Sequence, residues 1–104
     1  MFQTLDPTQL KALLEGDNPP RVIDVRTAAE FARGAIAGSQ HVELSTLPAS
    51  IDAFDPGASL VLVCQSGARS SQACAWLDQR GFQRVSNLGG GLAGWTRTGL
   101  PLTS

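Results

Sequence analysis

The sequence has 104 residues, a formal net charge of −1, 42% hydrophobic residues and 16% charged residues. These values are typical of one ordinary globular domain spanning residues 1–104, and they exclude the highly charged, poorly hydrophobic composition of disordered chains. The seven Arg and one Lys are interspersed with nine acidic residues, so we expect no basic surface for nucleic acid.

The beginning of the sequence, "MFQTLDPTQL", lacks the basic start and the apolar stretch of a secretory signal, and no window approaches 20 apolar residues. We therefore expect a cytoplasmic protein with no membrane partner. In a reducing compartment the two cysteines, Cys64 and Cys74, are expected to be thiols rather than a disulfide.

The first part of the chain predicts a capped helix and a buried strand. Residues 6–16 predict the helix, with Asp6 as its N-cap and Gln9 completing a capping box. The β-branched run at residues 21–25 predicts the strand.

Shorter elements follow. Residues 27–34 predict a helix of about two turns that begins with a second capping box, formed by Thr27 and Glu30. Residues 39–44 predict a brief strand, and residues 45–54 predict a short helix that begins near a proline.

The second half of the chain alternates strands and helices. Residues 59–64 are a continuous apolar run, which predicts a strand in the centre of a sheet that is covered on both faces. A helix is predicted from Ser70 to residue 81, a strand at 82–88 and a last short helix at 89–95. Strands that alternate with helices predict an α/β fold, a three-layer sandwich in which helices flank both faces of a small, mainly parallel sheet.

Cys64 lies at the end of the predicted central strand, directly before a loop and a helix N-terminus. The carboxyl ends of parallel strands face the ligand crevice, and the N–H groups of residues 65–70 can converge above the sulfur, with Gly67 allowing a positive φ. Such donors, and the positive end of the helix, favour a thiolate and any anion bound to it. Arg69 adds a guanidinium suited to an anion. The candidate nucleophile is therefore Cys64, and the candidate substrate-binding residues are Gln65, Ser66, Gly67, Ala68, Arg69 and Ser70.

The alternative interpretation is structural: Cys64 would be a small buried residue that ends a strand, followed by an ordinary turn. From the residues alone, both interpretations remain open.

Three segments together resemble the single-domain rhodanese family, over residues 22–101. "DVRTAAEFARGAIAGS" is similar to the D-V-R, E-F and G-H-I-x-G-A pattern, and "VLVCQSGARSSQACAWL" resembles the active-site strand, loop and helix. "VSNLGGGLAGWTRTGLP" is similar to the closing L-x-G-G, W and G-x-P pattern.

The resemblance implies a rhodanese-like fold and a sulfurtransferase of the thiosulfate:cyanide type. Cys64 would take a sulfane sulfur from thiosulfate or a low-molecular-weight persulfide and pass it to cyanide or a thiol, in two steps. No cofactor or metal is implied, and a sulfur-relay protein is a further candidate partner. The family pattern places Trp95 near the active-site side of the fold, as a packing residue. Asp24 and Arg26 lie at the end of the first predicted strand, where they could touch substrate; the favoured interpretation is that they hold loops through ion pairs and backbone bonds, with Arg26 close enough to pair with Glu30.

Two alternatives remain. A persulfide carrier or protein-docking module would share this loop. A phosphatase or arsenate reductase is opposed by loop length, because the resembling loops that act on phosphate are one residue longer. The sequence also departs from the family pattern: Gln65 replaces a frequent Arg, which leaves donor preference open, and Ala35 and Glu43 replace a frequent His and Pro.

Cys74 and His41 carry weaker signals. Cys74 lies in the helix after the loop, where a core position is favoured over a resolving thiol. The lone His41 is expected to be structural or exposed.

Overall fold

The computed structural model describes residues 2–103 of the chain. Along the chain the elements are β1 (Gln3–Leu5), α1 (Pro7–Leu14), β2 (Arg21–Asp24), α2 (Ala28–Ala32), β3 (Gln40–His41), η1 (Leu44–Thr46), α3 (Leu47–Ser50), η2 (Ile51–Ala53), β4 (Leu60–Val63), α4 (Ala68–Gln79), β5 (Val85–Leu88) and α5 (Gly91–Arg97).

Five parallel strands form one sheet in the order β1-β5-β4-β2-β3. The central strand is β4, whose four residues are all buried, as expected for an apolar run covered on both faces. The expected α/β class with a parallel sheet is confirmed.

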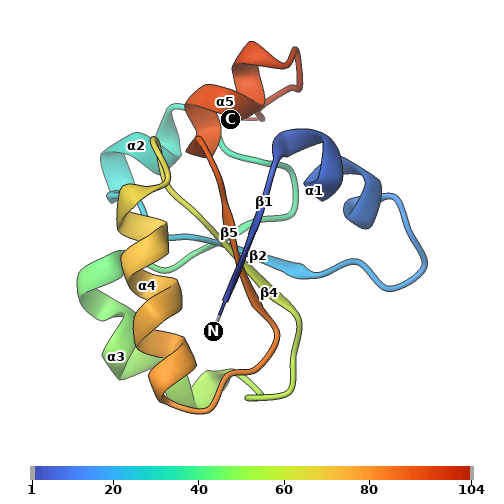
Figure 1. The fold of residues 1–104 in the computed structure, drawn as a ribbon. Coiled ribbons are helices and arrows are strands. Elements are labelled where there is room, and N and C mark those ends of the chain that lie inside the picture. Colours follow the sequence, from blue (N-terminus) through green and yellow to red (C-terminus); the bar gives the residue numbers. More distant parts are fainter. Residues whose placement is uncertain (1, 104) are drawn as a thin grey trace.

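Two separate hydrophobic cores lie on the two faces of the sheet. Helices cover both faces, and Figure 1 shows the resulting three layers. On one face, Leu47 of α3 and Leu77 of α4 pack against Leu62 of β4. On the other face, Leu10 of α1 and Leu92 of α5 pack against the alternate residues of the same strand. The sheet is thus held from both sides, and the carboxyl end of β4 is fixed between the two layers.

Both predicted capping boxes are present. The Asp6 carboxylate accepts a hydrogen bond from the Gln9 N–H at 2.8 Å, and the Thr27 hydroxyl accepts one from the Glu30 N–H at 3.3 Å. Within residues 2–103, no helix is both long enough and apolar enough to cross a membrane.

Several elements differ from those predicted from the sequence. Strand β3 is limited to Gln40–His41 within the predicted 39–44, β5 begins at Val85 rather than at residue 82, and α5 spans Gly91–Arg97 rather than 89–95. The edge strand β1 was not predicted, because three half-exposed residues carry little periodic signal. The helix predicted at residues 45–54 is divided into η1, α3 and η2. Helix α4 begins at Ala68 rather than Ser70, because Gly67 in the left-handed region (φ 99°) is its N-cap.

Candidate active site

Cys64 directly follows β4 and has no exposed surface. In Figure 1 the start of α4, the start of α5 and the short helix α2 all gather at this end of the molecule. Cys64, the candidate nucleophile, is therefore placed by the sheet itself, at the edge where parallel strands end.

Three donors point at the sulfur of Cys64. The Gly67 N–H lies 3.1 Å from Sγ, and the N–H and hydroxyl of Ser70 each lie 3.3 Å from it. The positive φ of Gly67 turns the chain so that donors on both sides of this residue face the same atom. The predicted convergence of loop N–H groups is therefore present in the structure.

These donors lower the pKa of the Cys64 thiol. Burial raises the pKa of Cys64, but hydrogen bonds from the Ser70 hydroxyl and from the N–H groups of Ser70, Gly67 and Ser66 lower it by more in total. The pKa of Cys64 therefore lies below its ordinary value. Because the thiolate is the nucleophilic form of cysteine, the loop prepares Cys64 for attack.

A buried amide holds the serine that contacts the sulfur. The Ser70 hydroxyl also donates to Asn87 Oδ1, at 2.5 Å, so its one proton is shared between this oxygen and Sγ, and Asn87 Nδ2 donates to the Gly67 carbonyl at 3.2 Å. Asn87 comes from β5 and ties the loop to the neighbouring strand. The sequence analysis missed this residue, although a polar amide at a buried position of a strand was a usable signal.

The start of α5 fixes the carbonyl side of the same loop. The N–H of Leu92 donates to the Cys64 carbonyl at 2.9 Å, and the N–H of Ala93 donates to the Gln65 carbonyl at 3.0 Å. Gly91 makes this approach possible, since a Cβ there would lie 2.5 Å from both of those carbonyl oxygens. The carbonyl groups of Cys64 and Gln65 are thus bonded to α5, while the N–H groups of Gly67 and Ser70 point to the sulfur.

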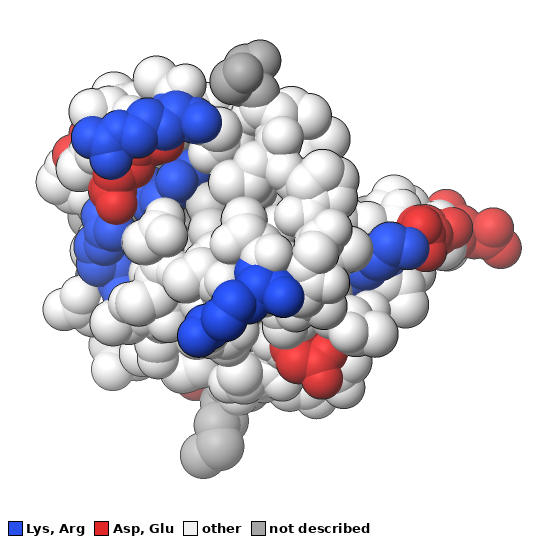
Figure 2. All heavy atoms as spheres, turned by 90° about the horizontal axis from the view of Figure 1, so that it is seen from above, with Lys and Arg blue, Asp and Glu red and all other residues white. Residues whose placement is uncertain are grey.

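Arg69 is not a free guanidinium. Its Nη1 and Nη2 donate to the two carboxylate oxygens of Glu30 in α2, at 2.7 and 2.8 Å. The expected pair between Arg26 and Glu30 is wrong, because each of these residues has another partner. Figure 2, which looks down on this end of the molecule, shows basic and acidic side chains side by side at its left. The ion pair joins α2 to the Cys64 loop.

Asp24 and Arg26 form a second, buried ion pair beside the loop. Arg26 Nη2 lies 2.9 Å from Asp24 Oδ2 and 2.7 Å from the Gly34 carbonyl, and both charged residues are buried. Trp95 is buried too, and its Nε1 donates to the Pro101 carbonyl at 2.9 Å. These three residues hold segments around the site; none of them has a hydrogen bond to the Cys64 sulfur among the contacts of residues 2–103.

The sequence of this chain fits one family model, that of the rhodanese-like domain, from residue 6 to residue 98. This match covers most of the chain. The chain belongs to the rhodanese-like family.

Rhodanese-like relatives match over nearly their whole length. A protein named sulfurtransferase from Allochromatium vinosum is 36% identical over all of this chain and 97% of its own. The thiosulfate sulfurtransferase GlpE of Pseudomonas aeruginosa is 39% identical over 90% of this chain and 84% of its own. The crystal structure of a rhodanese-like domain protein from Staphylococcus aureus has a TM-score of 0.88 at 28% identity, covering 99% of this chain and 100% of its own. The resemblance inferred from the three sequence segments is thereby confirmed.

The second cysteine of this rhodanese-like domain belongs to the core. Cys74 is fully buried against Ala73 and Leu77, and both cysteines are free. Burial, together with the charge of Cys64, raises the pKa of the Cys74 thiol to about 12. The core position favoured by the sequence is the observed one.

The side chain of the lone histidine, His41, packs against neighbouring residues and contacts the backbone. Its ring stacks on Phe31 with centroids 4.7 Å apart, and its Nε2 lies 2.7 Å from the Arg26 carbonyl. Among the residues that the structure describes, no three His, Cys, Asp or Glu side chains are grouped so that they could hold a metal ion.

The Glu30 carboxylate should make the domain sensitive to acid. Hydrogen bonding from Arg69, with help from Thr27, lowers the pKa of Glu30 from 4.5 to about 2. A depressed carboxyl pKa stabilises the fold above the unfolded value, and this stability is lost as the pH falls from 4.5 towards 2. Glu30→Gln keeps the capping oxygen but loses the ion pair. It should lower the free energy of unfolding by about 1–2 kcal/mol at pH 7, and the difference should vanish near pH 2.

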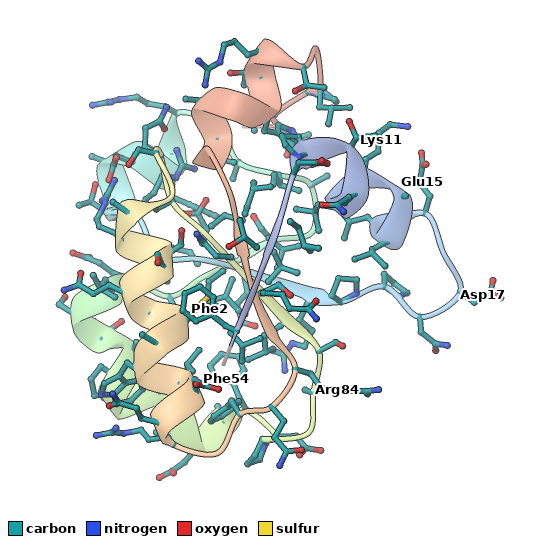
Figure 3. All side chains as sticks on the ribbon, viewed as in Figure 1. Phe2, Lys11, Glu15, Asp17, Phe54 and Arg84 are labelled. Carbon is teal, nitrogen blue, oxygen red and sulfur yellow. The ribbon has the colours of Figure 1, made fainter. Side chains whose placement is uncertain are left out.

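Urea unfolding between pH 2 and pH 7 measures this effect. Glu15→Gln is the matched control, because Glu15 pairs with Lys11 at 2.9 Å on an exposed helix surface (Figure 3), where such a pair contributes little. A constant difference between wild type and Glu30→Gln over the whole pH range would contradict the expectation.

Proposed function

We propose that the protein is a sulfurtransferase that carries a sulfane sulfur as a persulfide on Cys64. The observation that carries the proposal is the set of three donors on the Cys64 sulfur, from Gly67 and Ser70. They favour the thiolate over the thiol, and they would equally favour the negative charge of a persulfide held in the same loop.

The reaction takes two steps that balance without a cofactor. In the first step, the Cys64 thiolate attacks the outer sulfur of thiosulfate, an S–S bond forms to Cys64, and the S–S bond of the donor breaks to release sulfite. In the second step, cyanide or a thiolate attacks the terminal sulfur, which leaves as thiocyanate or as a new persulfide, and the Cys64 thiolate returns. A low-molecular-weight persulfide enters the first step in the same way and leaves as its thiolate.

The loop residues have separate roles in this proposal. Gly67 and Ser70 stabilise charge on sulfur, since both already donate to Sγ. Gln65, Ser66 and Ala68 are exposed and form the side from which a donor approaches. Arg69 holds the loop to Glu30, and two of its five N–H donors are used in doing so, which leaves three for an anionic substrate.

The buried residues around the loop act on it indirectly. Asp24 and Arg26 keep the chain after β2 in place through their ion pair. Trp95 anchors the segment after α5. We propose these three as supporting residues that do not contact the donor.

The test is the mass of the protein after reaction with a donor. The protein is incubated with thiosulfate, or separately with glutathione persulfide, alkylated and digested with trypsin. Cleavage after Arg69 places Cys64 and Cys74 on different peptides, so the second peptide is an internal control. We expect a gain of about 32 Da on the Cys64 peptide alone.

Reversal by cyanide makes the result specific. Oxidation to a sulfinic acid also adds about 32 Da, but only a persulfide returns to the thiol with cyanide. If neither donor gives an adduct while Cys64 is free to alkylation, the sulfurtransferase proposal fails, and a docking or phosphatase role gains weight.

A further inference from the structure

A polar cleft borders the Cys64 loop on the side of α2. It has a volume of about 290 Å³. Its lining residues are Arg26, Glu30, Arg33, Gly34, Gln65 and Leu102. Gln65, which lines the cleft, is the residue directly after Cys64, so the cleft borders the loop that holds the candidate nucleophile.

One charge in the cleft is not compensated. Arg26 is paired with Asp24, and Glu30 is paired with Arg69, so these four charges cancel. Arg33, by contrast, is exposed, and within residues 2–103 its guanidinium forms no ion pair or hydrogen bond. Among residues 2–103, Arg33 is therefore the charged residue of this cleft that has no ion-pair partner.

The cleft is large enough for a short-chain thiol. Its volume of about 290 Å³ far exceeds the roughly 10–15 Å³ that one water molecule needs, so a small organic molecule fits. Leu102 supplies an apolar wall for methylene groups, and the Gln65 amide supplies a hydrogen-bond donor in the same cleft. This combination suits a short aliphatic chain that ends in a carboxylate.

We propose that the cleft binds the carboxylate of a small thiol that accepts sulfur from Cys64, with Arg33 selecting for the negative charge. The inference rests on the proposed sulfurtransferase function. The guanidinium of Arg33 binds the carboxylate, and the aliphatic chain along Leu102 directs the thiolate towards the terminal sulfur on Cys64. The thiolate takes that sulfur as a persulfide and the Cys64 thiolate is restored.

Charge reversal at Arg33 tests the selection. Thiosulfate is the donor, and the acceptors are 3-mercaptopropionate, 2-mercaptoethanol and cysteamine, which are anionic, neutral and cationic at the end away from sulfur. For Arg33→Glu we expect kcat/KM with 3-mercaptopropionate to fall about tenfold, and kcat/KM with cysteamine to rise, while 2-mercaptoethanol changes less than about twofold. The effect should shrink at high ionic strength.

Arg84→Glu is the matched control. Arg84 is also exposed, and Figure 3 places it at the opposite end of the molecule from α2 and α5. The variant makes the same change in net charge far from the cleft. Equal acceptor preferences in Arg33→Glu and Arg84→Glu would overturn the proposal.

A binding measurement separates this inference from the proposed function. The unreactive thioether 3-(methylthio)propionate is titrated into ¹⁵N-labelled protein and backbone amide shifts are followed. We expect shifts at Gly34, Gln65 and Leu102 in the wild type and in Arg84→Glu, and their loss in Arg33→Glu. Absence of these shifts in the wild type refutes the cleft as a carboxylate site whether or not Cys64 forms a persulfide, whereas shifts without any persulfide refute only the sulfurtransferase function.

Discussion

Cys64→Ser is expected to abolish sulfur transfer, lowering turnover of thiosulfate and cyanide to below about one thousandth of the wild-type rate. The serine hydroxyl would lie among the same donors from Gly67 and Ser70, but it is not ionised at neutral pH and cannot carry a persulfide. The fold should survive, because Cys64 forms no disulfide and serine is nearly isosteric. Thiocyanate release measures the activity, and thermal unfolding checks the fold.

Cys74→Ala is the matched control for this experiment. Cys74 is a buried core residue, so its replacement should cost some stability and leave transfer within about threefold of wild type. A folded Cys64→Ser variant that retained substantial activity would remove Cys64 as the carrier of sulfur. Loss of activity in a folded Cys74→Ala variant would show that the second thiol takes part.

Gly91→Ala should disrupt the loop and destabilise the fold together. An alanine Cβ at this position would lie 2.5 Å from the carbonyl oxygens of Cys64 and Gln65, and the φ of 60° is unfavourable for alanine. The left-handed backbone costs about 1 kcal/mol, and moving two backbone carbonyls costs about 1–3 kcal/mol more. We expect the melting temperature to fall by more than about 10 °C, with loss of most of the transfer activity.

Gly99→Ala separates these two contributions. Gly99 also has a positive φ, 89°, but a Cβ there would meet nothing within 4 Å. Its replacement should cost only the backbone strain, about 1 kcal/mol, and leave sulfur transfer unchanged. Equal destabilisation of the two variants would show that the close approach of the Cys64 and Gln65 carbonyls does not exclude a side chain at position 91.

The sequence predicted the scaffold of the site well, because local signals dominate there. Each of the capping boxes at Asp6 and Thr27 involves only four consecutive residues, so the local sequence is enough to predict it. The apolar run before Cys64 is long enough to identify the central strand. Since the carboxyl ends of parallel strands lie at one edge of the sheet, the position of Cys64 at that edge followed from these elements.

The partners across the site were not predictable in the same way. Arg69 pairs with Glu30 across 39 positions of sequence, and Asn87 reaches Ser70 across 17. Such pairs depend on how separate elements pack, and sequence spacing carries no information on this. The expected Arg26 to Glu30 pair relied on short spacing alone, and tertiary packing gave both residues other partners.

The short strand β1 was missed for a related reason. It pairs only with β5, its residues are mostly exposed, and it has no β-branched run. Its place in the sheet depends on the neighbouring strand, whose register fixes it, rather than on its own propensity.

The core position of Cys74 has a consequence for how long sulfur can be kept. A persulfide on Cys64 could be consumed from within if a second thiolate of the same chain attacked the inner sulfur, closing a disulfide and expelling hydrosulfide. Cys74 is fully buried and its thiol pKa is raised to about 12, so almost no thiolate is present at neutral pH to begin that reaction. If Cys64 carries a persulfide as proposed, Cys74 would therefore not discharge it, and the lifetime of the persulfide would be set by the molecules that reach it from solution.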